Sequence, residues 1–128
     1  MKLNTKRFEQ VIRVGQEIVD QKRPFDIRTF RRDAQNQDCN TCCIFGWCAL
    51  DPWHMAQGLT LIPENEHYFL WFKGLSCVDA VSKYLAIYPR DAEILFFNGN
   101  SYPDKCYDAE FWLERIKLYL VKQDQVNV

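Results

Sequence analysis

The chain has 128 residues, of which 48% are hydrophobic and 26% are charged, and its formal net charge is −1. We therefore expect a single globular domain over residues 1–128, and the apolar and aromatic content excludes an intrinsically disordered protein. No apolar run reaches the roughly 18 residues that cross a membrane, and the first residues lack the apolar segment of a signal peptide. These observations indicate a soluble protein of the reducing cytoplasm.

Positive charge is concentrated in the N-terminal quarter of the chain. Residues 1–32 contain nine Lys or Arg and four Asp or Glu, so the remainder is acidic. Arg28, Arg31 and Arg32 form a basic cluster that can contact a protein partner or phosphate groups. A solvated surface is the plainer interpretation, because the pI of the whole chain is only about 6.1.

The first predicted element is an amphipathic helix over residues 5–22, which Asn4 or Thr5 can cap. Apolar residues at helical spacing mark its buried face: Phe8, Val11, Ile12, Ile18 and Val19. Pro24 ends the helix, and residues 25–30 are expected to form a short irregular segment. Residues 31–38 are polar apart from Ala34, which predicts an exposed loop.

A second helix is expected to begin near Asn40 or Thr41, with Asp38 or Asn40 as its cap. Between residues 42 and 50 every residue except Gly46 is apolar. A helix that is apolar on all sides is usually buried, so this segment should form the centre of the fold. Residues 51–52 end the helix, and residues 53–58 should make one more turn.

Two short segments, residues 59–63 and 68–72, are rich in branched and aromatic side chains and predict a β-hairpin, with Pro63 at its end or on an edge. Three further helices are expected near residues 76–85, 90–97 and 108–122. The predicted fold is therefore mainly α (α+β): four to five helices around a buried central helix, with one small β-hairpin.

Both alternating faces of residues 68–72 are apolar. One face should pack inward, and the other should be covered either by helices or by a partner. Because exposed aromatic residues often mark interfaces, Tyr68 and Trp71 join Arg28, Arg31 and Arg32 as candidate protein-binding residues.

Four of the six cysteines fall within ten residues: Cys39, Cys42, Cys43 and Cys48. A structural zinc site needs four converging ligands, usually supplied by two short pairs, and Cys39-x-x-Cys42 has no second pair. In a helix Cys48 points away from the other three thiols, so distant residues would have to complete a site: His54, His67, Cys77 or Cys106. We therefore expect no metal and no cofactor.

The candidate reactive thiols are Cys39, Cys42 and Cys43. Cys39 lies near the predicted helix N-terminus, where the pKa of a thiol is lowered. A thioredoxin-like site needs a buried strand before its cysteine pair, however, and residues 31–38 are polar. Since cysteine commonly packs as a small hydrophobic residue, buried structural thiols are the favoured interpretation.

The segment Cys39-Asn-Thr-Cys-Cys-Ile-Phe-Gly-Trp47 resembles the Cys-Gly-Thr-x-x-Cys-x-x-Gly-Trp motif of small uncharacterised proteins of bacteria and their phages. The likeness extends over roughly residues 25–116 and includes Ala49-Leu-Asp-Pro-Trp53. It implies a complete domain and carries no known activity. Cys39 and Cys43 match the two motif cysteines, with one residue fewer between Thr41 and Cys43 than in the motif, and Asn40 replaces the motif glycine, an exchange that the left-handed backbone tolerates.

No catalytic constellation is evident in the sequence, so we expect a non-enzymatic accessory protein that binds a host protein or protein complex. The resemblance implies a phage or mobile-element origin, and one concrete form is an inhibitor of a host defence complex in the manner of anti-CRISPR proteins. Two alternatives remain: a thiol-redox or zinc-binding protein that uses residues 39–43, and a nucleic-acid-binding protein that uses residues 28–32.

Overall fold

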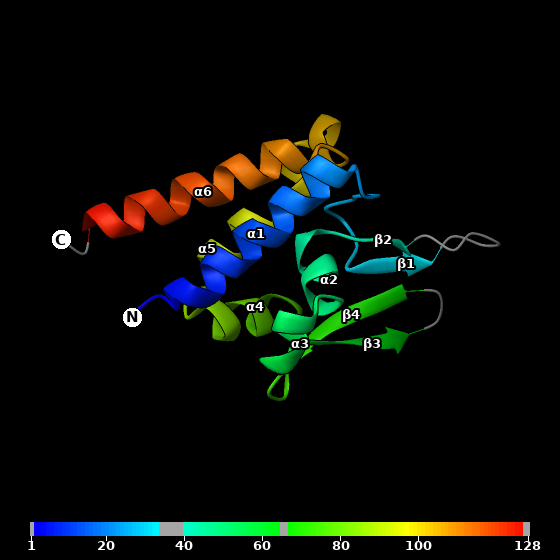
Figure 1. Ribbon diagram of the computed structural model, residues 1–128, viewed down its shortest axis with the longest axis horizontal. Helices are drawn as coiled ribbons and strands as arrows, with labels where there is room; N and C mark the ends of the chain where they lie inside the picture. The colour runs from blue at the N-terminus through cyan, green and yellow to red at the C-terminus, as the bar shows by residue number, and fades with distance from the viewer. Residues whose placement is uncertain (1, 34–39, 65–66, 127–128) are drawn as a thin grey trace.

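The computed structural model describes residues 2–33, 40–64 and 67–126. Its elements follow in the order α1 (Thr5–Gln21), β1 (Arg31–Asp33), β2 (Asn40–Thr41), α2 (Ile44–Ala49), α3 (Pro52–Ala56), β3 (Thr60–Glu64), β4 (His67–Phe72), β5 (Leu75–Ser76), α4 (Cys77–Leu85), α5 (Pro89–Phe96) and α6 (Ala109–Val126). Two 3-10 turns, η1 (Gly99–Ser101) and η2 (Pro103–Lys105), connect α5 with α6. The fold is mainly α with one small antiparallel sheet, as the sequence predicted (Figure 1).

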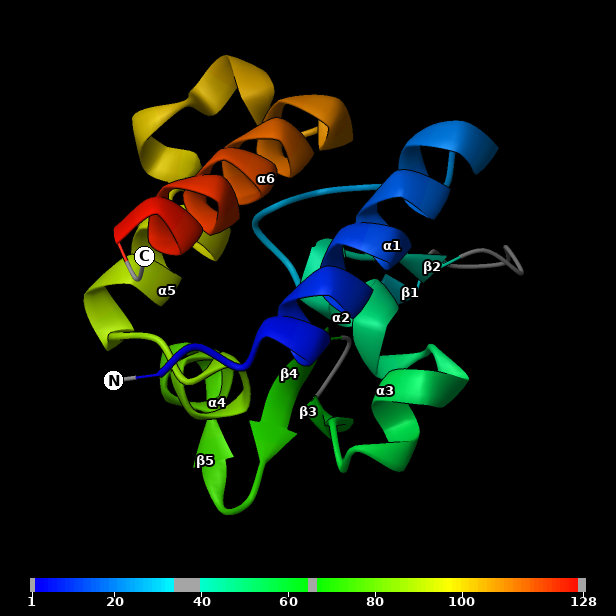
Figure 2. The ribbon, with the colours of Figure 1, turned by 60° about the vertical axis from the view of Figure 1, so that its left-hand side comes forward.

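The longest helices, α1 and α6, pack against each other and lie above the sheet (Figures 1 and 2). The side chain of Asn4 accepts a hydrogen bond from the Arg7 amide at 3.1 Å and so caps the start of α1. Lys22 ends the helix with a left-handed backbone, φ 52°. The predicted helix is confirmed, and its buried side comprises Phe8, Val11, Val14, Gly15 and Ile18. Of the residues predicted for this side, Ile12 and Val19 are only half-buried.

The sheet is antiparallel, with the strand order β2-β1-β4-β3 and with β5 also paired to β4. Strands β3 and β4 form the expected hairpin, in which Pro63 lies opposite Tyr68. A proline has no N–H to donate to a neighbouring strand, so it is tolerated on an edge strand such as β3 and not in a central strand. The prediction of a hairpin with Pro63 on an edge is confirmed.

The prediction of an exposed loop over residues 31–38 is wrong for its first part. Arg31–Asp33 forms β1, which pairs with β2 on one side and with β4 on the other. One of its partners, β2, is close in the chain, but the other, β4, follows more than 30 residues later, and the polar composition of β1 alone does not indicate a strand. Residues 34–38 lie outside the described residues.

The central helix begins later than the sequence suggested. Asn40–Thr41 forms β2, and α2 begins at Ile44 with Cys43 as its N-cap. The Cys43 Sγ accepts a hydrogen bond from the Gly46 amide at 3.4 Å, so the helix is capped by a thiol. The caps predicted from the sequence were Asp38, which lies outside the described residues, or Asn40, which lies in β2. The predicted burial of this helix is confirmed for Ile44, Phe45, Gly46, Cys48 and Ala49.

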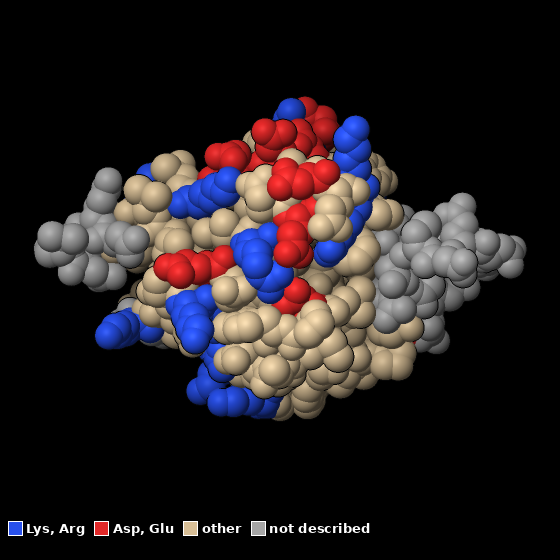
Figure 3. All heavy atoms as spheres, in the orientation of Figure 1, with Lys and Arg blue, Asp and Glu red and all other residues tan. Residues whose placement is uncertain are grey.

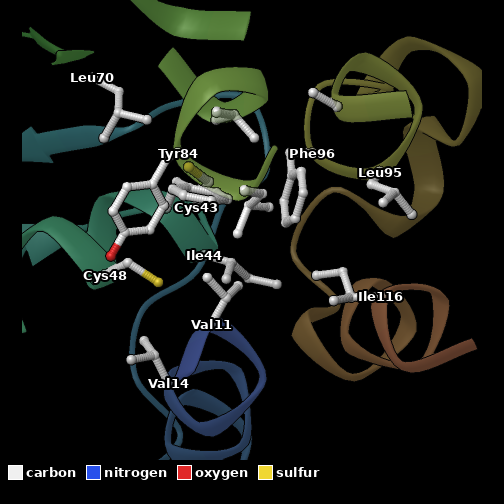
Figure 4. Close-up of a cluster of buried hydrophobic side chains, with 14 of the residues drawn as sticks. Val11, Val14, Cys43, Ile44, Cys48, Leu70, Tyr84, Leu95, Phe96 and Ile116 are labelled. Carbon is white, nitrogen blue, oxygen red and sulfur yellow. The ribbon is translucent and has the colours of Figure 1, made fainter. Parts of the chain in front are cut away.

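A single cluster of buried side chains unites α2 with α1, β4, α4, α5 and α6. Figure 4 shows Ile44 of α2 between side chains of α1 and α5, with Tyr84 of α4 on another side. Phe45 packs edge to face against Tyr84 and Phe96, with ring centroids 6.1 and 4.8 Å apart. No helix of the described residues combines the length and the apolar character needed to cross a membrane.

Candidate functional site

The β3–β4 hairpin has two faces in different environments. Leu70 and Phe72 of β4 are buried in the core. Because successive side chains of a strand point to opposite faces, Phe69 and Trp71 lie on the other face, where Ile62 of β3 is directly opposite Phe69. Trp71 is 36% exposed, and Ile62 and Phe69 are partly exposed. We call the surface formed by Ile62, Phe69 and Trp71 the outer sheet face.

The structure brings together part of the predicted protein-binding set. Trp71 lies on the outer sheet face, whereas Tyr68 alternates with it and belongs to the same side of β4 as Leu70. The backbone of Arg31 lies directly opposite Tyr68, and that of Arg32 lies opposite His67. The backbone of Arg31 and Arg32 therefore lies beside the hairpin.

Arg28 is held elsewhere, in the segment after α1. Its guanidinium donates two hydrogen bonds to Asp26, at 2.9 and 3.0 Å, and a third to the hydroxyl of Tyr107 at 2.6 Å. The hydrogen bonds to Asp26 raise the pKa of Arg28 above its ordinary value. Asp26 is buried, so Arg28 compensates a buried carboxylate, and this structural task competes with any contact to a phosphate.

The region around the outer sheet face is poor in charge. Residues 34–72 include no Lys or Arg, and the area over α3 is uncharged in Figure 3, while the hairpin carries the exposed Glu64. Met55 of α3, a separate element, is 57% exposed. Sequence reasoning missed Met55, Ile62 and Phe69 as surface residues. The absence of Lys and Arg from residues 34–72 was the sequence feature that could have indicated these exposed apolar residues.

The described thiols are mostly buried. Cys42, Cys43, Cys48 and Cys106 are each at most 4% exposed, and Cys77 is half-buried. Burial raises the pKa of Cys43 to about 12 and that of Cys48 well above its ordinary value, so both thiols are protonated at neutral pH. The candidate Cys39 lies outside the described residues.

The two histidines lie in contrasting environments. His54 of α3 is fully buried, and its Nδ1 is 2.5 Å from the hydroxyl of Tyr84. Burial lowers the pKa of His54, which favours the neutral imidazole. His67 is exposed at the start of β4, as its predicted position near a turn implied. Within the described residues, no group of three or more His, Cys, Asp or Glu side chains is arranged to hold a metal ion.

The motif residues 43–47 attach the irregular segment 24–30 to α2. The Cys43 amide donates to the carbonyl of Thr29 at 2.7 Å, and the Trp47 indole donates to that of Pro24 at 2.9 Å. At Gly46 an added Cβ would lie only 1.5 Å from the Phe30 carbonyl oxygen, so the motif glycine permits this close approach. Cys43, Gly46 and Trp47 therefore hold residues 24–30 against the start of α2.

Comparisons of the chain with models of protein families, with curated proteins and with solved structures returned no match. The outer sheet face has three distinguishing features: its aromatic side chains are partly exposed, it contains no Lys or Arg of the hairpin, and the opposite side of β4 is buried in the core.

Proposed function

We propose that this protein acts by binding another protein through the outer sheet face. The observation that carries the proposal is the exposure of Trp71 beside Phe69 and Ile62 on a sheet whose other side already packs in the core. Tryptophan is among the side chains that contribute most free energy to protein interfaces. A partner that covers this strip removes apolar surface from water, which favours the complex.

Charge narrows the kind of partner. Strands β3 and β4 contain no Lys or Arg, and the exposed Glu64 alternates onto the same side as Ile62. Within the hairpin a phosphate backbone would meet this carboxylate and no cation, and the nearest basic residue by strand pairing is Arg32 of β1, opposite His67. The surface is better suited to a protein whose contact region is apolar at the centre and neutral or basic at the rim.

A narrower form of the proposal rests only on the resemblance of residues 39–47 to a motif of small bacterial and phage proteins. In this form the protein is a non-enzymatic accessory factor of a phage or mobile element, and it inhibits a host defence complex in the host cytoplasm, as anti-CRISPR proteins do. Expression in a bacterial strain with an active CRISPR system would then restore sensitivity to a targeted phage. Unchanged resistance would contradict the narrower form and leave the binding proposal standing.

The binding proposal is tested by comparing two exposed aromatic residues on different elements. Immobilised wild-type protein, Trp71→Ser and Tyr88→Ser would be used to capture proteins from a host lysate. Tyr88 is the matched control, because it is exposed at the start of α5 and is not part of the sheet. We expect Trp71→Ser to weaken capture of the specific partner at least about tenfold, and Tyr88→Ser to retain it.

Circular dichroism and thermal unfolding of both variants would establish that each remains folded. If folded Trp71→Ser captures the same proteins as the wild type with the same affinity, the outer sheet face is not the binding surface.

A further inference from the structure

Helix α6 carries apolar side chains on two opposite faces. Trp112, Leu113 and Ile116 are buried in the core. On the opposite side Leu118 and Val121 are 54% and 51% exposed, although a helix that packs on one side usually presents polar residues on the other. The fold therefore uses one face of α6 and leaves a second apolar face accessible.

Oppositely charged residues flank Leu118 on this second face. Glu114 lies about one helical turn before Leu118 and Lys122 about one turn after it, and both are exposed. Shallow hollows adjoin Leu118: one of about 430 Å³ is lined by Phe111 and another of about 220 Å³ by Leu95. The surface around Leu118 can therefore receive side chains from another molecule.

We infer that this face of α6 binds a second copy of the chain, with the two α6 helices antiparallel about a two-fold axis at Leu118. In this arrangement the two Leu118 side chains meet, and Glu114 of each copy faces Lys122 of the other. A parallel pairing would place Glu114 against Glu114 and Lys122 against Lys122. The order of charges thus selects the antiparallel homodimer.

Within its own helix Glu114 contacts Lys117 at 3.4 Å, an exposed pair of the kind that contributes little to stability. This pair leaves Glu114 able to reorient toward a cation across the axis. The contact from Phe111 to Lys122 extends over about 18 Å of helix, which is short for an obligate dimer. The dimer is therefore weak and exchanges with the monomer at micromolar concentrations.

Reversing the charges separately and together tests the geometry. Sedimentation equilibrium from micromolar to submillimolar protein measures association of the wild type, Glu114→Lys and Lys122→Glu. Each single variant places like charges across the axis and should be largely monomeric. In an equal mixture, a Glu114→Lys copy can pair with a Lys122→Glu copy. The introduced lysine at position 114 then faces the introduced glutamate at position 122, and the native Lys122 of the first copy faces the native Glu114 of the second. The mixture should therefore recover association, as should the double variant.

The apolar contact is tested with a matched pair of exposed residues. Leu118→Glu should abolish association, whereas Met55→Glu on α3, a site of similar exposure, should leave it unchanged. Circular dichroism verifies that each variant is folded. A wild-type protein that stays monomeric at the highest concentration would overturn the inference. A dimer that persists in Leu118→Glu, or one that the charge-reversed mixture fails to restore, would also overturn it.

Discussion

Cys43 uses both its backbone and its thiol within the fold. Its amide donates to Thr29, and its Sγ accepts from the amide of Gly46 at the start of α2. Desolvation raises the pKa of the thiol to about 12, so it stays protonated at neutral pH. Because the thiolate is the nucleophile and the metal ligand, this environment opposes a redox or zinc role for Cys43.

The thiols provide a direct test of burial at the level of single residues. With iodoacetamide on the native protein, we expect Cys77 to be alkylated before Cys42, Cys43, Cys48 and Cys106, since Cys77 alone among these five is only half-buried. Peptide mass spectrometry over time measures the order, and unfolding in urea should expose all five. Native Cys43 reacting as fast as Cys77 would contradict the structural role of its thiol.

His54 makes stability depend on pH. Burial lowers its pKa in the folded protein, while the unfolded chain takes up the proton near pH 6.5. Above pH of about 6.5 His54 is neutral in both states and does not oppose folding. As the pH falls from there toward the pKa of His54 in the folded protein, the unfolded chain binds a proton that the folded protein does not, and the free energy of unfolding decreases. The free energy of unfolding should decrease by at most about 1.4 kcal/mol per pH unit from this group.

Urea unfolding between neutral and mildly acidic pH measures this dependence. The chain has two histidines, so His54→Gln and the exposed His67→Gln are matched variants. We expect His54→Gln to reduce the dependence and His67→Gln to preserve it. The opposite outcome would assign the effect to the surface histidine.

At the level of elements, the position of α2 depends on its neighbours more than on its own sequence. The helix is six residues long, too short to be stable alone, and its start is set by contacts of Cys43 and Gly46 with segment 24–30. Its apolar composition predicted burial correctly. The start was predicted too early, because pairing of Asn40–Thr41 with β1 competes with helix formation there.

Gly46 is expected to be intolerant of substitution. In Gly46→Ala the new Cβ would meet backbone atoms of Phe30, whereas in Gly15→Ala it would meet the flexible end of Leu113 at 2.7 Å. We expect Gly46→Ala to lower the free energy of unfolding by about 4 kcal/mol or more, and Gly15→Ala by less than about 2 kcal/mol. Chemical denaturation of both helical variants provides the comparison. Equal losses would show that the approach of Phe30 to α2 is not constraining.

In the sheet, the hairpin strands could be predicted from neighbouring residues, whereas β1 could not. Alternation of apolar residues predicted β3 and β4, and Pro63 indicated an edge. The polar β1 was missed: its pairing with β2 has no apolar alternation to indicate it, and its second partner, β4, follows more than 30 residues later in the chain. The sequence pattern that groups the arginines with Trp71 does not contain the pairing of β1 with β4, which the structure shows.

For the whole molecule, a single core implies cooperative unfolding. One cluster of buried side chains includes residues of α1, α2, β4, α4, α5 and α6. We expect one thermal transition, with equal calorimetric and van't Hoff enthalpies and coincident fluorescence and circular dichroism signals. Two separate transitions would contradict the prediction of one domain over residues 1–128.

Local sequence pattern was sufficient to predict the amphipathic helices, the burial of most of residues 42–50 and the hairpin, because helical and strand periodicity are properties of neighbouring residues. Four features required the three-dimensional fold: β1 joins the hairpin, Cys43 caps α2, Arg28 pairs with a buried carboxylate, and Trp71 lies on the accessible side of the sheet. These features depend on contacts between distant segments, whose free energy is set by packing and hydrogen bonding across the fold rather than by local pattern.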